Sequence, residues 1–373
     1  MQMKNILTVI GTRPEAIKLI PLAIKLNDSR FLRNKICITR QHISLVDSLF
    51  TSNNIKVDYQ FRPYKKNAFL SQSFAYMLLQ FNNLLGVTKP DLIIVQGDTT
   101  TGLVAALAGF YAKIKVAHVE AGLRSGNLYS PWPEEAHRII IDKISNYFFV
   151  PTEKAKTCLI NEGVNDDKIW VVGNTSIDAI KVISENIKSN FDLSNKSIVV
   201  TLHRRENHGE PLINICNALK NIARNFPDVR INFCLHPNPS VHNKVKEILS
   251  GISNIKLLAA LDHAEFVKLL TQCIFIITDS GGIQEESTFL GKPVLIARNV
   301  TERTELIEKG TGILVGTNTE NIFKHSRMLL EDPILLSKMS KIHFPYGDGY
   351  ASERIVKILE KIELLSNVVY EKN

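Results

Sequence analysis

Short apolar runs alternate with longer amphipathic stretches along the whole chain. This alternation is typical of βαβ units and a parallel sheet. The apolar runs predict a first series of strands at 5–10, 35–39, 91–96, 115–119, 146–150 and 169–172, and a second at 197–201, 229–235, 255–259, 274–278, 293–296 and 312–315. Amphipathic patterns predict helices that include 14–27, 70–86, 100–112, 136–145 and 152–162.

A polar stretch rich in Asn and Ser, from Ser184 to Lys196, separates the two series. The chain of 373 residues also exceeds the usual size of a single core. We therefore expect an α/β fold of two Rossmann-like parallel-sheet domains facing a central cleft, over 1–184 and 185–348. The amphipathic segment 349–373 is expected to form a terminal helix, packed on its own domain or crossing back to the first.

Composition and charge narrow the class of partner. The chain is 45% hydrophobic and 22% charged, as in ordinary globular proteins, and its net charge of +8 favours an anionic ligand. No basic run with interleaved aromatic residues is present, which favours a phosphorylated small molecule over nucleic acid. No apolar run approaches the ~20 residues that span a bilayer, and the first apolar run is too short for a signal peptide. We expect a cytoplasmic protein.

The cysteines are isolated and odd in number, without the spacing of metal ligands. Several lie in apolar runs, where a free cysteine behaves as a small buried hydrophobe. A reducing compartment and the absence of a structural zinc are therefore predicted. The residues concerned are Cys37, Cys158, Cys216, Cys234 and Cys273.

Acidic residues follow two successive predicted strands. Asp98 closes one apolar run and Glu120 follows the next. Ligands of open parallel sheets bind outside the carboxyl ends of the strands, so the two carboxylates are expected at one acid/base site. Glu134 and Glu135 follow in the same segment. His118, inside the strand before Glu120, is expected to be packed.

The segment from Gly11 to Lys18 forms a strand-to-helix junction. Pro14 suits the first helical position, where its missing N–H costs nothing. A helix N-terminus favours an anion, and Arg13 and Lys18 add positive charge. The alternative is a surface turn with solvated cations. The junction lacks the GxGxxG and P-loop patterns, so neither NAD nor ATP is predicted.

A stronger anion-binding signal follows a strand of the second series, in DSGGIQEE (279–286). Ser280 can cap the helix that begins there, and Gly281 and Gly282 let backbone N–H groups approach a diphosphate. Glu286, near the second turn, can accept hydrogen bonds from ribose hydroxyls. The alternative is a capped helix with solvated acids.

Histidines at strand ends are further candidates. His203 ends the first strand of the second series and can contact phosphate or act as an acid/base, although it can also be a packed histidine beside surface arginines. His42 and His236 end other strands and are weaker candidates. Arg303 fits a substrate contact and a surface ion pair equally well.

Together these motifs resemble those of the non-hydrolysing UDP-N-acetylglucosamine 2-epimerases. One matching piece would carry little weight, but eight in family order are highly specific. The pieces are GTRPEAIK (11–18), QGDTTT (96–101), HVEAGLRSGNLYSPWPEEAHR (118–138), VVGNTSIDA (171–179), HRREN (203–207), HPNP (236–239), DSGGIQEE (279–286) and TER (301–303).

The resemblance implies a fold similar to that of the GT-B glycosyltransferases and a homodimer. It also implies reversible conversion of UDP-N-acetylglucosamine to UDP-N-acetylmannosamine for surface polysaccharide synthesis, without nicotinamide or metal. UDP is eliminated to give a 2-acetamidoglucal and is then added back. By motif match, the catalytic set is Asp98, Glu120, Glu134 and His203. The match assigns UDP binding to Arg13, Lys18, Ser280, Gly281, Gly282 and Arg303, with Glu286 at the ribose and Phe266 near the uracil.

Many members of the family carry a second, regulatory nucleotide-sugar site. Its matching residues here are Gln41, His42, Glu135, Arg204 and His236. The chain departs from the family pattern in Ile43-Ser44 and in the loop 58–67, so activation by substrate is not expected.

Three alternatives stay open. A hydrolysing epimerase would share the elimination step and release free N-acetylmannosamine, but GNLYSPWPEE resembles the non-hydrolysing branch. A GT-B glycosyltransferase would leave Asp98 and Glu120 without a shared purpose. A non-catalytic nucleotide-sugar sensor conflicts with the acid cluster, because buried carboxylates cost stability.

Overall fold

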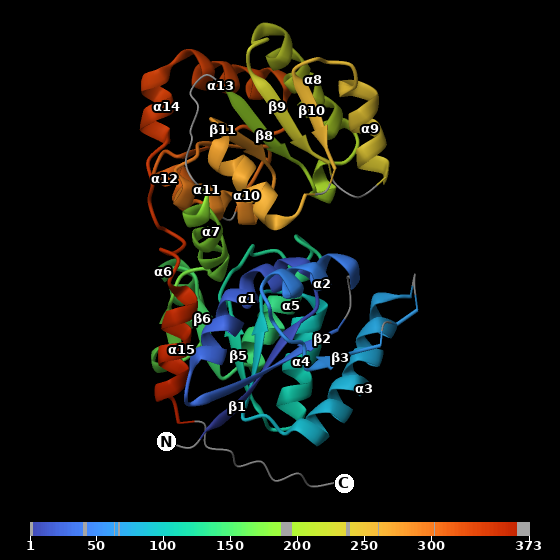
Figure 1. The fold of residues 1–373 in the computed structure, drawn as a ribbon, viewed down its shortest axis with the longest axis vertical. Helices are drawn as coiled ribbons and strands as arrows, with labels where there is room; N and C mark the ends of the chain where they lie inside the picture. Colours follow the sequence, from blue (N-terminus) through green and yellow to red (C-terminus); the bar gives the residue numbers. More distant parts are fainter. Residues whose placement is uncertain are drawn as a thin grey trace. The chain divides into compact units, whose positions relative to one another are not determined.

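The computed structural model describes residues 3–39, 43–62, 64–65, 68–187, 196–235, 239–259, 261–301 and 303–363. The chain divides into two compact units: Met1–Ala179 with Tyr346–Asn373, and Ile180–Pro345. Each unit contains a parallel sheet with helices around it (Figure 1). The predicted α/β fold with two parallel-sheet domains is confirmed. The first unit ends at Ala179, within α7 (Thr175–Asn186). This boundary lies before the polar stretch 184–196, where the sequence predicts it.

The first unit has a seven-stranded sheet in the order β3-β2-β1-β4-β5-β6-β7. Its strands are β1 Lys4–Ile10, β2 Leu32–Ile38, β3 Tyr59–Gln60, β4 Leu92–Gln96, β5 Lys115–Val119, β6 Tyr147–Val150 and β7 Ile169–Val171. Its helices, besides the first turn of α7 up to Ala179, are α1 Arg13–Asp28, α2 Ile43–Ser52, α3 Leu70–Thr88, α4 Thr100–Tyr111, α5 Glu134–Ile144, α6 Glu153–Asn161 and α15 Ala351–Lys361. The two-residue edge strand β3 is the one strand that the sequence patterns miss among the described residues.

The second unit has a six-stranded sheet in the order β10-β9-β8-β11-β12-β13. The strands are β8 Ser197–Thr201, β9 Arg230–Cys234, β10 Ile255–Leu258, β11 Phe275–Thr278, β12 Val294–Ile296 and β13 Gly312–Leu314. The helices are α8 Glu210–Asn225, α9 Pro239–Leu249, α10 His263–Gln272, α11 Gly281–Leu290, α12 Glu305–Glu308, α13 Thr319–Glu331 and α14 Pro333–Met339.

Both sheets reverse their strand order at one point. In the first unit the reversal lies between β1 and β4, and in the second between β8 and β11. Loops leave the carboxyl ends of these neighbouring strands in opposite directions, which opens the crevice where doubly wound sheets bind ligands. The predicted motifs GTRPE and DSGG follow β1 and β11, so the topology places both at these reversal points.

Continuous apolar strands explain why helices cover both faces of each sheet. All five residues of β4 are buried. One face of the first sheet packs on Leu19 and Leu22 of α1 with Ile355 of α15, and the other on Phe81 of α3 and Val104 of α4. In the part of the chain that the structure describes, no helix has the length and apolar character to cross a membrane.

The terminal helix α15 belongs to the first unit and packs beside α1. Its N-terminus is held by Asp178, whose carboxylate accepts hydrogen bonds from the backbone N–H groups of Ala351 (3.1 Å) and Ser352 (2.8 Å). At its other end, the Lys4 amine donates to the carbonyl oxygens of Leu359 (2.9 Å) and Glu360 (3.0 Å). A carboxylate at the N-terminus and a cation at the C-terminus both complement the helix dipole.

Substituting Lys4 by Met is expected to lower the free energy of unfolding by about 1–2 kcal/mol, because the last carbonyls of α15 lose a charged donor. Urea denaturation measures this change. Lys357→Met provides the matched control, because it removes only an exposed i,i+4 pair with Glu353. Equal stability of the two variants would contradict the capping role of Lys4.

Candidate active site

A capping box builds the N-terminus of α1. Thr12 is the N-cap, and its hydroxyl and backbone N–H (2.6 Å) both contact the carboxylate of Glu15. Glu15 also accepts from the backbone N–H of Gly11 (3.1 Å) and the hydroxyl of Thr99 (2.7 Å), which caps α4. Glu15 therefore joins the loops that follow β1 and β4 at the point of strand reversal. Glu15 was not predicted, although the Thr-x-x-Glu spacing of a capping box is a sequence signal that could have identified it.

Burial raises the pKa of Glu15 to about 7, although its hydrogen bonds with Thr12, Thr99 and Gly11 oppose the shift. A carboxyl whose pKa is higher in the folded than in the unfolded state stabilises the fold at low pH. The contribution of Glu15 to the free energy of unfolding is fully present below the ordinary carboxyl pKa near 4.5 and is lost as the pH rises through about 7.

Glu15→Gln is expected to remove this pH dependence. Between about pH 5 and 8, the stability of the unsubstituted protein should fall relative to that of the variant by roughly 2–3 kcal/mol, since one pKa unit corresponds to about 1.4 kcal/mol. Urea denaturation of both proteins across this range measures the difference. A difference that does not change with pH would show that Glu15 has an ordinary pKa.

Glu120 adopts a left-handed conformation after β5, with φ of 67°, which is uncommon for a residue other than glycine. Its carboxylate is almost completely buried and accepts hydrogen bonds from the Lys18 amine and the Gln96 side-chain amide. Lys18, predicted as a diphosphate contact, thus lies beside an acid in this structure. Arg13, the other predicted cation, is half-buried at the first position of α1. Gln96 was not predicted.

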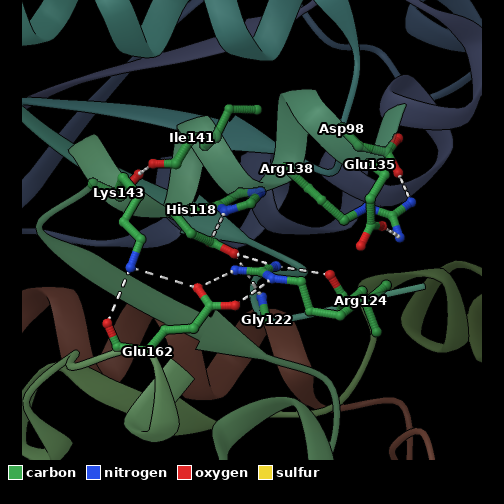
Figure 2. A network of polar contacts seen from close by, with 12 residues as sticks. Asp98, His118, Gly122, Arg124, Glu135, Arg138, Ile141, Lys143 and Glu162 are labelled. Atoms are coloured by element: carbon green, nitrogen blue, oxygen red, sulfur yellow. Dashed lines mark hydrogen bonds and ion pairs between the residues drawn. The ribbon is translucent and has the colours of Figure 1, made fainter. Parts of the chain in front are cut away.

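Asp98 lies after β4, where its carboxylate pairs with Arg138 of α5 (Figure 2). His137 Nδ1 lies 3.0 Å from the carbonyl oxygen of Asp98. Arg138 also contacts Glu135 (Nη1 to Oε2, 3.1 Å), and the fully buried Glu135 accepts from the backbone N–H of Ser125 (2.9 Å). The helix α5 therefore supplies a cation to Asp98 and fixes the loop after β5.

Glu134 is the first residue of α5, next to Glu135. Its Oε2 atom is buried and has no hydrogen-bond partner among the described residues. A buried carboxylate oxygen without a partner is costly, so it is a candidate for a contact with substrate.

In the second unit, Asp279 organises the loop after β8. Its completely buried carboxylate accepts from the backbone N–H groups of His203 and Arg204 (both 3.0 Å) and from the side chain of Asn207 (2.8 Å). His203 Nδ1 lies 3.0 Å from the same carboxylate. Burial alone would raise the pKa of Asp279, but the hydrogen bonds and charge of His203, with the other donors, hold it below its ordinary value. Asp279 thus fixes the ring of His203, with Nδ1 facing the carboxylate.

The helix α11 begins beside this loop. Ser280 occupies the N-cap position, but its side chain makes no capping hydrogen bond, so the predicted capping interaction is absent. Gly281 packs under the Arg303 guanidinium, whose Cζ would lie 2.6 Å from a Cβ at that position. Arg303 is held by the buried Glu285 (Nε to Oε1, 2.9 Å). The structure therefore places the cation Arg303 at the N-terminus of α11, where positive charge and free backbone N–H groups would suit an anion.

The remaining predicted residues are placed as follows. Gly282 lies in the first turn of α11, and a Cβ there would be 3.8 Å from Glu286 Oε1. Phe266, on α10, packs partly buried against the core of the second unit. Arg204 is half-buried in the loop after β8. Gln41, His42 and His236 lie outside the described residues.

Metal ligands and reactive cysteines do not stand out in the described ranges. No group of three or more His, Cys, Asp or Glu side chains there is arranged to hold a metal ion. All five cysteines are free thiols, and burial raises the pKa of each.

The architecture and the two sets of polar residues define a doubly wound, two-domain protein with acids after the strands of one unit and an arginine beside a helix N-terminus in the other. The family model described as UDP-N-acetylglucosamine 2-epimerase matches residues 24–360. The chain therefore belongs to the UDP-N-acetylglucosamine 2-epimerase family, which confirms the resemblance seen in the motifs.

Individual relatives match over nearly their whole length. The UDP-N-acetylglucosamine 2-epimerase of Campylobacter jejuni is 45% identical over 374 residues, covering 96% of this chain and 98% of the relative. The crystal structure of UDP-GlcNAc 2-epimerase from Neisseria meningitidis bound to UDP-GlcNAc has a TM-score of 0.92 at 41% identity, with 96% and 100% of the two chains covered. The S. aureus MnaA-UDP co-structure has a TM-score of 0.90 at 39% identity, with 100% and 99% covered.

Proposed function

We propose that this protein interconverts UDP-N-acetylglucosamine and UDP-N-acetylmannosamine reversibly and without net hydrolysis. UDP leaves across C1–C2 as the C2 proton is removed, giving a 2-acetamidoglucal. A proton then returns to C2 on the opposite face and UDP adds back to C1. Names and bound ligands of the relatives support the substrate, and the segment GNLYSPWPEE supports the non-hydrolysing branch.

The observation that carries the proposal is the pair of acids, Asp98 and Glu120, at the carboxyl ends of the adjacent strands β4 and β5. Removal and return of a proton on opposite faces of a sugar ring requires two proton-transfer groups, and carboxylates are suited to that role. Each acid is paired with a cation, Asp98 with Arg138 and Glu120 with Lys18, which orients its carboxylate. The unpartnered Glu134 Oε2 is a third candidate.

The second unit supplies the groups that suit a departing diphosphate. Backbone N–H groups at the start of α11 and the guanidinium of Arg303 would stabilise the negative charge of UDP as the C1–O bond breaks. His203, fixed by Asp279, would contact phosphate or transfer a proton. Glu286 and Phe266 are proposed at the ribose and the uracil. These steps use only side chains and backbone of the protein.

The product, an activated amino sugar, is a suitable glycosyl donor for surface polysaccharide synthesis, which we propose as its use. A cytoplasmic homodimer and the absence of substrate activation stay predictions. Turnover of UDP-N-acetylmannosamine in the absence of UDP-N-acetylglucosamine would support the last of these, and a strict requirement for UDP-N-acetylglucosamine would contradict it.

Product analysis from both directions tests the proposed reaction. Purified protein incubated with UDP-N-acetylglucosamine, or with UDP-N-acetylmannosamine, should reach the same mixture of the two, and free UDP should not accumulate. Release of N-acetylmannosamine with an equal amount of UDP would assign the hydrolysing reaction instead. Binding of UDP without either product would favour the transferase or the sensor.

A further inference from the structure

A buried ionic network lies beneath the loops that bear Asp98 and Glu120. Four side chains form it: His118 of β5, Arg124 in the loop after β5, Asp142 of α5, and Glu162 after α6. His118 and Asp142 are almost completely inaccessible to solvent. Figure 2 shows Arg124 pointing toward Glu162, with His118 and Gly122 nearby.

Both ring nitrogens of His118 face oxygen acceptors. Nε2 lies 2.7 Å from the carbonyl oxygen of Gly97, and Nδ1 lies 2.6 Å from Asp142 Oδ1. A carbonyl oxygen carries no proton, so Nε2 must donate one. The proton between Nδ1 and Asp142 then decides whether the histidine is a cation.

The surroundings of Asp142 favour its ionised form. Its Oδ2 accepts from Arg124 Nη1 (2.8 Å) and from the backbone N–H of Gly122 (3.2 Å). Burial alone would raise the pKa of Asp142, but the charges and hydrogen bonds of His118 and Arg124 hold it below its ordinary value. An ionised carboxylate can only accept hydrogen bonds, so Nδ1 must donate as Nε2 does. Glu162 balances the charge of Arg124 (Nε to Oε1, 2.7 Å), so a histidine cation paired with Asp142 would leave the network without net charge.

We propose that His118 is a positioning residue whose two ring nitrogens both donate hydrogen bonds and so fix the loops bearing both catalytic acids. Through Nε2 it holds the carbonyl of Gly97, the residue before Asp98. Through Nδ1 it holds Asp142, which in turn holds the backbone of Gly122, two residues after Glu120. The left-handed backbone of Glu120 therefore lies between two anchored points. The kinetic part of this inference rests on the proposed epimerisation.

Nitrogen NMR of the unsubstituted protein with ¹⁵N-labelled histidine tests the protonation state directly. At about pH 7.5, the proposal predicts a histidine signal with two protonated ring nitrogens. That signal should vanish in His118→Gln and change to a single protonated nitrogen in Asp142→Asn. If every histidine carries only one ring proton at that pH, the proposal is overturned, whether or not a variant folds.

Kinetics test the positioning role. Glutamine has a single donor nitrogen and cannot replace two ring nitrogens that serve separate acceptors. The kcat of His118→Gln should therefore fall by about 10²-fold, with UDP affinity unchanged. Lys143→Gln is the matched control, because the exposed Lys143 contacts only the rim of the network at Glu162. A kcat within twofold of the unsubstituted enzyme would overturn the positioning role. An unsubstituted protein that does not epimerise would instead refute the proposed function and leave the NMR test decisive.

Discussion

Replacing Asp98 by Asn, or Glu120 by Gln, is expected to lower kcat by about 10³-fold or more while UDP still binds. An amide cannot accept the C2 proton and cannot return one, so either proton transfer fails. UDP binding should persist because the protein groups proposed to bind its diphosphate, at the start of α11 and on Arg303, belong to the second unit and are unchanged. Initial rates with UDP-N-acetylglucosamine and calorimetric titration with UDP measure the two effects.

A control at the other end of the same strand separates chemistry from folding. Asp91 precedes β4, and its carboxylate accepts a hydrogen bond from the backbone N–H of Asn5 (2.7 Å). Asp91→Asn should retain nearly full turnover. Near-normal turnover in Asp98→Asn or Glu120→Gln would contradict the assignment of these acids. So would an equal loss in the control.

Asp279→Asn is expected to lower kcat by about 10²-fold or more and to destabilise the second unit. The amide replaces one acceptor oxygen by a donor, which then faces the N–H groups of His203 and Arg204. His203 loses the carboxylate that orients its ring, and the loop after β8 loses its anchor. Because the pKa of Asp279 is held below its ordinary value, the stability that it contributes is present above about pH 4 and is lost as the pH falls.

The matched control for this substitution is Asp332→Asn in the same unit. Asp332 caps α14 through the backbone N–H groups of Ile334 and Leu335 (both 2.9 Å), and asparagine caps helices equally well. This variant should keep its activity and its stability. Full activity in Asp279→Asn at about pH 7.5 would show that the carboxylate does not orient His203.

The strands of both sheets were predictable because fully buried parallel strands are continuous apolar runs, as in β4. The edge strand β3 was missed because it has two residues, too few to form a periodic pattern. Local signals also identified the acids after β4 and β5, since an acid that directly follows a buried run stands out in the sequence.

Partners distant along the chain were beyond local patterns. Asp279 holds the backbone of His203, 76 positions earlier, and Arg138 reaches Asp98 across 40 positions. The sequence predicted only that His118 is packed. Its contact with Gly97 depends on the register of β4 with β5, and its contact with Asp142 depends on how α5 packs. Sequence patterns predict the position of a residue on a strand, helix or loop, whereas tertiary packing determines which group its side chain contacts.

Proton NMR of the purified protein with UDP-N-acetylglucosamine in D2O tests the central claim most directly. Reversible elimination and re-addition predict deuterium at C2 of the sugar, together with a new anomeric signal of UDP-N-acetylmannosamine and no lasting release of UDP. Free N-acetylmannosamine with stoichiometric UDP, or epimerisation without deuterium at C2, would contradict the account.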